Sequence, residues 1–282
     1  MTAQPVAAVR LERVLELLKT RDSVQVAELA RDLGVSQVTI RSDLTLLARQ
    51  GLIARVRGGA RALQRGQSEV AFDVRLRLQA SAKRAIARAA AAMVSDGEAV
   101  ALDSSTTAYY IALELRARHE LVVITNGLLV AAALADAPGV SVIVPGGIVR
   151  HAAMSLVGDF ADAVLHTTQI NHGFFGARGI SVERGLMDLN PDEARLKSAM
   201  TEVCQRVVGV LDSSKWHRTG LLSFAPADCI HAIITDAQAP PELVQKWRDR
   251  GVEVVTVEVE HRGPPERVQG LKRSVPAVED IS

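Results

Sequence analysis

The chain has few cysteines, few aromatic side chains and no long apolar run. Its two cysteines among 282 residues, Cys204 and Cys229, match no metal or redox spacing, so neither kind of site is expected. No hydrophobic run approaches the ~20 residues of a membrane helix, and the first residues lack the layout of a signal peptide. With 48% hydrophobic residues, the chain has enough apolar side chains for packed cores and enough length for two domains. We therefore expect a folded cytoplasmic protein.

Charge is unevenly distributed along the chain. Residues 1–65 contain eleven Lys and Arg and six Asp and Glu, a net charge of +5, whereas the remaining residues carry −4. A basic segment joined to a mildly acidic body indicates that one part meets a polyanion, although a solvated basic face has the same charge. The motifs within the basic segment have to distinguish these two interpretations.

Three helices are predicted in the basic segment. Apolar residues at helical spacing indicate a first helix over residues 10–19, and AELARDL predicts a second, from about Ala27 to Gly34. Ser36 is expected to cap a third, which runs to about Gln50. A helix, a short glycine turn and a capped helix are the parts of a helix-turn-helix.

The third helix has one apolar and one polar face. Ile40, Leu44 and Leu47 form the stripe expected in the core. The opposite face is short, polar or cationic and carries no acid, which suits approach to an anion. The residues that we expect to contact DNA from this helix are Ser36, Gln37, Val38, Thr39, Arg41, Ser42, Thr45 and Arg49.

A wing is predicted after the third helix. The run LIARVR alternates apolar and basic residues before Gly58 and Gly59, so we expect two short strands, or a strand and a turn, with Arg55 and Arg57 on one face. A wing beside a recognition helix can grip phosphate or enter the minor groove. Together the two features favour a DNA-binding domain over a solvated helical domain.

The same residues resemble a known signature. The run V-S-x-x-T-I-R-x-D-L, followed about a dozen residues later by R-x-x-G-G-A, is similar to the N-terminus of the DeoR family of bacterial transcription regulators. The family usually has a second basic residue where this chain has Ser42. The matching residues are Val35, Ser36, Thr39, Ile40, Arg41, Asp43, Leu44, Arg55, Gly58, Gly59 and Ala60.

The larger part of the chain is predicted to be α/β. Seven short aliphatic runs alternate with helical stretches, which implies a Rossmann-like parallel sheet covered on both faces. We expect a winged helix-turn-helix domain (1–62), a linker whose second half begins to fold (63–82), an effector-sensing domain (83–260) and a disordered tail (261–282). The runs lie at 99–102, 121–125, 140–144, near 175, 206–211, 231–235 and 252–259.

Polar residues and glycines follow four of these strands. Ligands of parallel sheets bind beyond the carboxyl ends of the strands, where hydroxyls and free N–H groups at a helix N-terminus suit an anion and Lys215 adds charge. Asp103 and Asp212 can accept hydrogen bonds from sugar hydroxyls. Each residue alone could be a cap or a turn, but their recurrence favours an effector site. The candidates are Asp103, Ser104, Ser105, Thr106, Thr107, Asn126, Gly146, Gly147, Arg150, Asp212 and Lys215.

Residues 72–259 resemble the sensor domain of the DeoR family. That domain is similar to the ribose-phosphate isomerase and glucosamine-phosphate deaminase fold, and the resemblance implies that it senses a phosphorylated sugar or related metabolite. The family usually has Gly in place of Ser105, which could narrow the phosphate loop, and Asp in place of Asn171. The matches include Phe72 with Arg75, K-x-x-I-A at Lys83, D-x-x-T-T at Asp103, Thr125-Asn126, G-G at 146, G-x-x-G at 176, Glu193 with Lys197, and D-S-S-K at Asp212.

Two functions are compatible with such a chain. An isomerase-like enzyme with a fused DNA-binding module could use Asp103, Glu193 and Lys215 as acid, base and oxyanion partner. An acid at the start of a helix has a structural explanation, however, and a DNA-reading module is hard to explain in a metabolic enzyme. We therefore expect no catalytic residue, metal or cofactor, but a repressor of a sugar or related carbon-metabolism operon. It would bind double-stranded operator DNA as a homodimer or homotetramer, and activation stays open.

Overall fold

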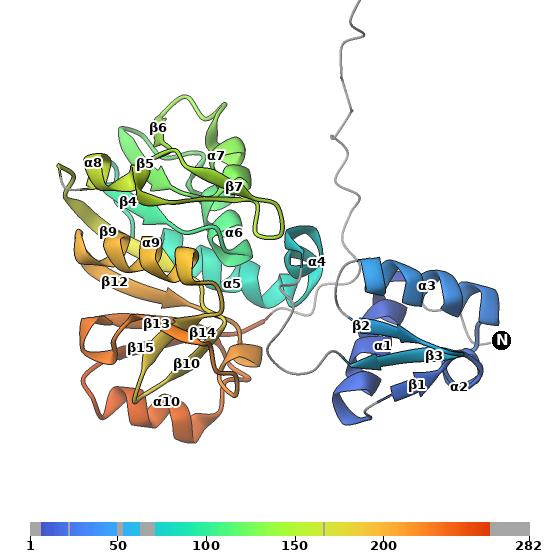
Figure 1. Ribbon diagram of the computed structural model, residues 1–282. Coiled ribbons are helices and arrows are strands. Elements are labelled where there is room, and N and C mark those ends of the chain that lie inside the picture. The colour runs from blue at the N-terminus through green and yellow to red at the C-terminus, as the bar shows by residue number, and fades with distance from the viewer. Residues whose placement is uncertain (1–6, 22, 50–52, 63–70, 166, 260–282) are drawn as a thin grey trace, which may run out of the picture.

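The computed structural model describes residues 7–21, 23–49, 53–62, 71–165 and 167–259. The predicted tail, 261–282, and the first part of the predicted linker, 63–70, lie outside these ranges. The described residues form a small helical unit with a three-stranded sheet and a larger unit around a seven-stranded sheet (Figure 1).

The N-terminal unit has the predicted helix-turn-helix and wing. The third helix agrees with its predicted bounds to within a residue, whereas the first begins three residues earlier than predicted and the second ends two residues before Gly34. The wing is a hairpin of β2 and β3 closed by a turn at Arg57 and Gly58. The first strand, β1, was not predicted; it pairs with β3, so the sheet order is β1-β3-β2. The elements are α1 (Ala7–Thr20), β1 (Ser23–Gln25), α2 (Val26–Asp32), α3 (Gln37–Arg49), β2 (Ile53–Val56) and β3 (Gly59–Ala62).

The core of this unit lies where the periodicity of α3 places it. Ile40, Leu44 and Leu47 are at most 1% exposed and pack among buried residues of α1, α2 and the sheet. Gly59 allows β3 to lie tightly against β1, because a Cβ there would stand 2.0 Å from the carbonyl oxygen of Val24. The recognition helix and the wing are thus fixed to one core.

The larger unit is built on a parallel sheet. All seven predicted runs form its strands, and every neighbouring pair is parallel. The strand order is β15-β14-β12-β9-β4-β5-β6, so the chain turns outward in opposite directions from β4 and β9, which makes their carboxyl ends the topological switch point. The strands are β4 (Ala99–Leu102), β5 (Leu121–Thr125), β6 (Val140–Ile143), β9 (Ile170–Phe175), β12 (Cys204–Val210), β14 (Ala232–Asp236) and β15 (Glu253–Val257).

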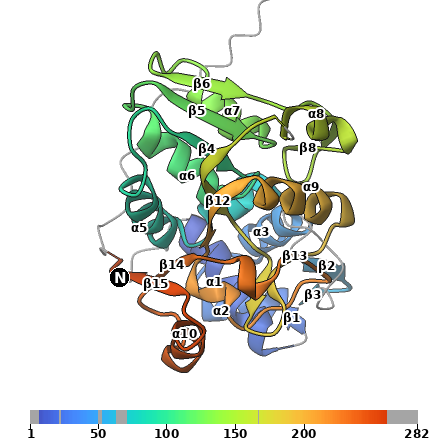
Figure 2. The ribbon, with the colours of Figure 1, turned by 90° about the vertical axis from the view of Figure 1, so that its left-hand side faces the viewer.

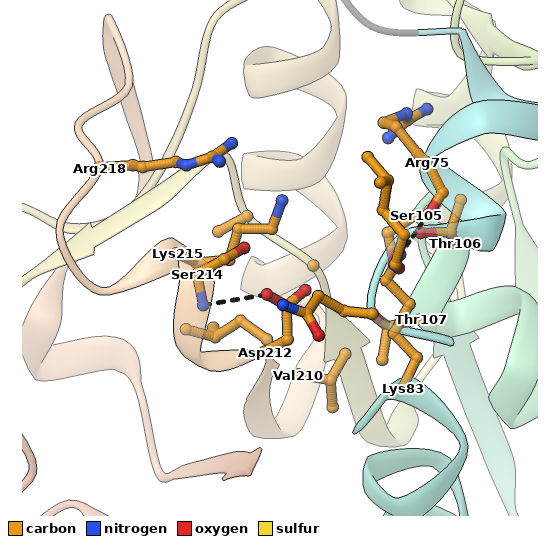
Figure 3. A pocket seen from close by; sticks show the side chains of 15 residues that line it. Arg75, Lys83, Ser105, Thr106, Thr107, Val210, Asp212, Ser214, Lys215 and Arg218 are labelled. Carbon is orange, nitrogen blue, oxygen red and sulfur yellow. Dashed lines mark hydrogen bonds between the residues drawn. The ribbon is translucent and has the colours of Figure 1, made fainter. Parts of the chain in front are cut away.

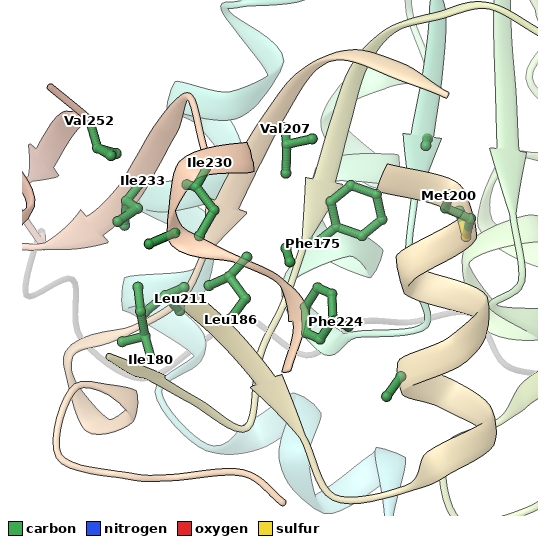
Figure 4. Packing of buried hydrophobic residues seen from close by; sticks show 14 of the residues in the cluster. Phe175, Ile180, Leu186, Met200, Val207, Leu211, Phe224, Ile230, Ile233 and Val252 are labelled. Atoms are coloured by element: carbon green, nitrogen blue, oxygen red, sulfur yellow. The ribbon is translucent and has the colours of Figure 1, made fainter. Parts of the chain in front are cut away.

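Both faces of the sheet are covered. The helices α5 (Ala80–Ala91), α6 (Thr106–Leu115) and α7 (Leu128–Leu134) share one apolar cluster with the sheet. The helices α9 (Pro191–Glu202) and α10 (Pro241–Arg248) belong to the opposite cluster (Figure 2). Figure 4 shows residues of the second cluster, where Phe175 and Phe224 lie next to each other.

Among the described residues, no helix is long and apolar enough to cross a membrane.

Several short elements were not predicted, because strands of three or four residues show little alternation. The antiparallel sheet β10-β11-β13 packs in the second cluster, and the hairpin β7-β8 follows β6. These elements are α4 (Phe72–Arg77), β7 (Ile148–Arg150), β8 (Ser155–Val157), η1 (Asp159–Ala161), α8 (Asp162–Leu165), β10 (Gly179–Ser181), β11 (Gly185–Asp188), η2 (Ser213–Lys215), β13 (Leu222–Ala225) and η3 (Ala227–Cys229).

Candidate DNA-binding surface and effector pocket

The outer face of α3 is open to solvent. Val38 is 72% exposed, and Arg41, Ser42 and Thr45 are exposed as well. The predicted cap is present, since the Ser36 hydroxyl accepts a hydrogen bond from the backbone N–H of Thr39 at 3.1 Å. This face therefore offers an apolar side chain, hydroxyls and a guanidinium along one helix, the groups that read base edges and phosphates. Of the other predicted contacts, Gln37 is exposed, Thr39 is half-buried, and the side chain of Arg49 lies outside the described part.

The acid of the family-like signature points into the domain. Both Asp43 oxygens accept hydrogen bonds from Arg10, with Nε to Oδ2 at 2.5 Å and Nη2 to Oδ1 at 3.1 Å. The bond to Asp43 raises the pKa of Arg10, although burial opposes it. This bidentate pair ties α1 to α3, with only 11% and 9% of the two side chains exposed. It keeps the carboxylate away from the surface that faces an anion.

The wing adds three arginines. Arg55 in β2, Arg57 in the turn and Arg61 in β3 are all exposed. Arg57 lies one position beyond β2, so the strand alternation used in the prediction does not extend to it. Within the described ranges, none of the three forms an ion pair, which leaves their charges available to a polyanion.

A pocket opens at the switch point of the parallel sheet. It has a cavity volume of about 90 Å³, and its walls come from α4 and α5 and from the loops after β4, β9 and β12 (Figure 3). The lining residues are Arg75, Leu78, Gln79, Lys83, Ser105, Thr106, Thr107, Gly176, Ala177, Val210, Leu211, Asp212, Ser214, Lys215 and Arg218.

Positive charge predominates in this pocket. Four cationic side chains line it, Arg75, Lys83, Lys215 and Arg218, together with one carboxylate, Asp212. Burial is the main cause that lowers the pKa of Lys83 to about 7 and that of Lys215 to about 8. Asp212 opposes this shift, and neighbouring cations contribute to it. Burial raises the pKa of Asp212, but Lys215, Lys83 and the Ser214 contacts outweigh this, so the net pKa is below its usual value. One negative charge thus faces four cations, which suits an anionic ligand.

Five of the predicted effector residues line the pocket: Ser105, Thr106, Thr107, Asp212 and Lys215. The Ser105 hydroxyl accepts a hydrogen bond from the N–H of Ala108 at 3.1 Å, so it caps α6. Gly176 lies directly opposite, where a Cβ would stand 2.4 Å from the Cβ of Ser105. The predicted residues that are not part of the lining are Asp103, Ser104, Asn126, Gly146, Gly147 and Arg150.

Three of these other residues belong to a network around Glu193 at the start of α9. Arg150 Nη1 donates to Glu193 Oε1 at 2.8 Å, and Asn126 Nδ2 and the Ser104 hydroxyl donate to Oε2 at 3.3 and 3.4 Å. Ser155 completes the set through a short bond to Oε1. Because Glu193 is only 3% exposed and has these partners, the network joins the strand ends and the β7-β8 hairpin to α9.

Asp103 lies under the pocket and has a charged partner. Lys197 Nζ lies 2.9 Å from Asp103 Oδ2 and 2.8 Å from Asp188 Oδ2. Burial lowers the pKa of Lys197, but the carboxylates outweigh it and raise the pKa. Asp103 also accepts hydrogen bonds from the N–H groups of Ser105 and Gly176 at 3.0 Å each, so it fixes the loops that form two walls.

Glycines 146 and 147 follow β6 and have positive φ, and a Cβ on Gly147 would stand 2.5 Å from the carbonyl oxygen of Val157. Gly147 thus allows the close approach of the β7-β8 hairpin, whereas Gly146 supplies only a backbone conformation that other residues rarely adopt. Asn171 lies at the amino end of β9, where its side-chain oxygen accepts a hydrogen bond from the N–H of Ala99 at 2.9 Å. This departure from the family pattern is therefore remote from the pocket walls.

Three cations of the pocket were missed as site residues. Arg75 and Lys83 belong to family-like motifs, which are the signal that could have identified them, but they precede the strands whose carboxyl ends predict the pocket. Arg218 carries no sequence signal that we can identify. It reaches the pocket only because η2 turns the chain back after β12.

The chain matches two family models and several named relatives. Residues 10–65 match the DeoR-like helix-turn-helix domain, and residues 78–237 match the DeoR C terminal sensor domain. A candidate aga operon transcriptional repressor of Escherichia coli O157:H7 is 38% identical over 250 residues, which cover 88% of this chain and 93% of that protein. The L-fucose operon activator of Haemophilus influenzae is 32% identical over 238 residues, which cover 84% and 95%.

Solved structures share much less with the chain. A ribose 5-phosphate isomerase A from Methanocaldococcus jannaschii is 16% identical with a TM-score of 0.36, and the match covers 48% of this chain and 53% of that one. A likeness of this degree supports no argument about activity. The two family models and the relatives do establish the family: the chain belongs to the DeoR family of helix-turn-helix transcription regulators.

Proposed function

We propose that the protein is a cytoplasmic regulator of an operon of sugar or related carbon metabolism. It dissociates from its operator DNA when a phosphorylated sugar or a similar acidic metabolite binds. The observation that carries the proposal is the charge of the pocket, where four cationic side chains face one carboxylate at the switch point. Phosphate groups need several cationic or N–H donors, and the backbone N–H groups at the start of α6 supply the latter type. In this proposal, Asp212 accepts hydrogen bonds from sugar hydroxyls.

Binding without turnover fits this site better than isomerisation. Of the three residues that could form an acid/base set, only Lys215 lines the pocket. Asp103 is paired with Lys197, and Glu193 with Arg150, so each carboxylate already has a cationic partner. The relatives named above are transcription regulators, in agreement with this interpretation.

Operator recognition in this proposal uses α3 and the wing. A single winged helix makes few base contacts, so a homodimer or homotetramer would present recognition helices to successive major grooves about 34–36 Å apart. An effector that favours a different arrangement of the subunits would weaken binding, and a coupling of ~1–3 kcal/mol is enough. One relative is named a repressor and another an activator, so both directions of control occur among the named relatives. In this proposal the direction depends on the position of the operator in the promoter.

Fluorescence anisotropy on DNA from upstream of the protein's own operon tests the proposal. We expect tight, salt-sensitive binding that one member of a panel of sugar phosphates releases, while the matching free sugar does not. Binding that no phosphorylated compound changes would remove the proposed effector class. Turnover of a panel member would instead support the enzyme.

A further inference from the structure

Arg75 lines the pocket and has two side-chain nitrogens whose N–H groups form no hydrogen bond within the part of the chain that the structure describes. Its Nε and Nη2 atoms are buried and have no hydrogen-bond partner among the described residues. The guanidinium lies over the ring of Phe72, 5.6 Å from the centroid, a contact that engages the charge but none of the N–H donors. Arginine stays protonated in proteins, so these donors cannot be removed by loss of a proton. A buried guanidinium in this condition needs an acceptor.

Other cations share the pocket with Arg75, and no described residue accepts a hydrogen bond from its Nε or Nη2. Its charge contributes to the lowered pKa values of Lys83 and Lys215, so the three groups repel one another across the pocket. Figure 3 shows Lys215 and Arg218 on one side and Arg75 on the other. An anion between them would accept hydrogen bonds from the unpaired N–H groups of Arg75 and offset the repulsion among the cations. Arginine is suited to this because its planar donors can bind two oxygens of a phosphate or carboxylate together.

Arg75 also lies close to the segment that connects the two units. It belongs to α4, the first element of the larger unit, and residues 63–71 join that helix to β3 of the DNA-binding domain. The larger unit holds the backbone of α4 at its last turn: Lys83 Nζ donates to the carbonyls of Arg75 and Leu78, and the Tyr110 hydroxyl donates to the carbonyl of Leu76 at 3.1 Å. Gln79 then adopts φ +54°, so α4 and α5 are separated by a left-handed residue.

We propose that Arg75 binds the anionic group of the effector, and that this contact makes the placement of α4 depend on occupancy of the pocket. The inference rests on the proposed function, because it assumes that the pocket takes an anion. It adds the route by which the anion acts on DNA binding. The effector holds α4 against the loops that carry Ser105 and Lys215, and thereby sets the point from which the DNA-binding domain is attached.

The test uses the full chain with inorganic phosphate as the probe and chloride at equal ionic strength as the reference. Phosphate affinity is measured by calorimetry, and amide hydrogen exchange is followed in α4. The variants are Arg75→Gln, Arg75→Lys and Arg77→Gln. Arg77 is the matched control, because it is an exposed arginine of the same helix and does not line the pocket.

In the wild type and in Arg77→Gln, phosphate should slow exchange of the α4 amides at least tenfold. Arg75→Gln should bind phosphate at least tenfold more weakly, and its α4 amides should exchange at the phosphate-free rate even when phosphate is raised to saturation. Arg75→Lys should recover part of the affinity, because it restores the charge without the paired donors. If Arg75 had a purely structural role, Arg75→Gln would still show slower exchange of its α4 amides once phosphate was saturating. Loss of this protection at saturation, in addition to weaker phosphate binding, therefore distinguishes the proposal from a structural role.

Two results would overturn the inference and leave the proposed function standing. One is Arg75→Gln binding phosphate as tightly as the wild type, with the same protection of α4. The other is phosphate that protects the Lys215 loop of the wild type but not α4. If neither phosphate nor any sugar phosphate binds the wild type, the effector assignment itself fails and this inference fails with it.

Discussion

The buried ion pair between α1 and α3 gives a prediction whose size follows from the structure. Asp43→Ala removes a carboxylate that accepts two hydrogen bonds and leaves Arg10 charged in a site where only 11% of its side chain is exposed. Loss of one partner of such a pair costs ~3 kcal/mol. For a domain of this size the total stability is roughly 3–8 kcal/mol, from ~0.05–0.15 kcal/mol per residue. The variant should therefore lose a large part of the stability of its DNA-binding domain.

Thermal unfolding of the full chain, with hydrogen exchange to separate the two units, measures this effect. The transition of α1 and α3 should fall by roughly 12–24 °C, since about 1 kcal/mol shifts the midpoint of a small domain by roughly 4–8 °C. The sheet of the larger unit should be unaffected. Operator binding should persist at low temperature and disappear as the N-terminal transition is crossed, because Asp43 faces the core and not the outer face of α3.

Two controls make the prediction refutable. Glu16→Ala removes the acid of the exposed pair with Arg13 in the same helix, where more than half of each side chain is exposed, and should cost at most ~0.5 kcal/mol. The double variant Arg10→Met with Asp43→Leu replaces the pair by apolar groups and should recover most of the lost stability. If Asp43→Ala is no less stable than Glu16→Ala but has lost its operator, Asp43 acts at the DNA and the reasoning is wrong.

Four further predictions concern the two candidate sites. Arg41→Ala should weaken operator binding by ~1–3 kcal/mol, about 5- to 150-fold, without changing effector affinity, whereas Arg13→Ala should change neither; equal anisotropy titrations would count against α3. Arg57→Ala should reduce the slope of log affinity against log salt by about 0.9, and an unchanged slope would place Arg57 off the phosphates. Lys215→Met should keep operator binding but abolish the effector response, and an intact response would move the anion site elsewhere. Sulfate affinity should fall at least tenfold between pH 6.5 and 8.5, because Lys83 and Lys215, with pKa values of about 7 and 8, lose their protons over this range and a bound anion needs them protonated. Calorimetry at three pH values measures this, and an affinity that does not change with pH would show that the two lysines do not bind the anion.

The sequence predicted the elements whose burial imposes a pattern. The seven strands of the parallel sheet are buried on both faces and thus appear as continuous apolar runs, and α3 repeats Ile40, Leu44 and Leu47 at helical spacing. The strands β7, β8 and β10 contain three residues each, too few to show a period. Length of the element, more than its role, decided which parts could be found.

The site was harder to predict, because the position of a residue along the chain does not say which wall of the pocket it reaches. The loops of Ser105 and Lys215 both follow strand ends, and the topology brings them to one edge of the sheet, where both residues line the pocket. Asn126 and Arg150 also follow strands, yet they turn to Glu193 because that buried carboxylate needs partners. Arg75 precedes all seven strands of the parallel sheet and enters the pocket from α4.

The distribution of charge supports the proposal that the pocket binds an anion without a reaction. Isomerisation of a sugar phosphate needs a carboxylate that takes up a proton next to the substrate. Among the described residues, Asp212 is the carboxylate in the pocket lining. Its pKa lies below the usual value because Lys215, Lys83 and the Ser214 contacts stabilise its ionised form, which makes it a weak base. Asp103 and Glu193 are the carboxylates that the sequence suggests for this role, but Lys197 and Arg150 hold them in ion pairs outside the lining. An enzyme would require these carboxylates to be released toward the ligand, whereas a sensor requires only that the unbalanced cations around Asp212 acquire an anion.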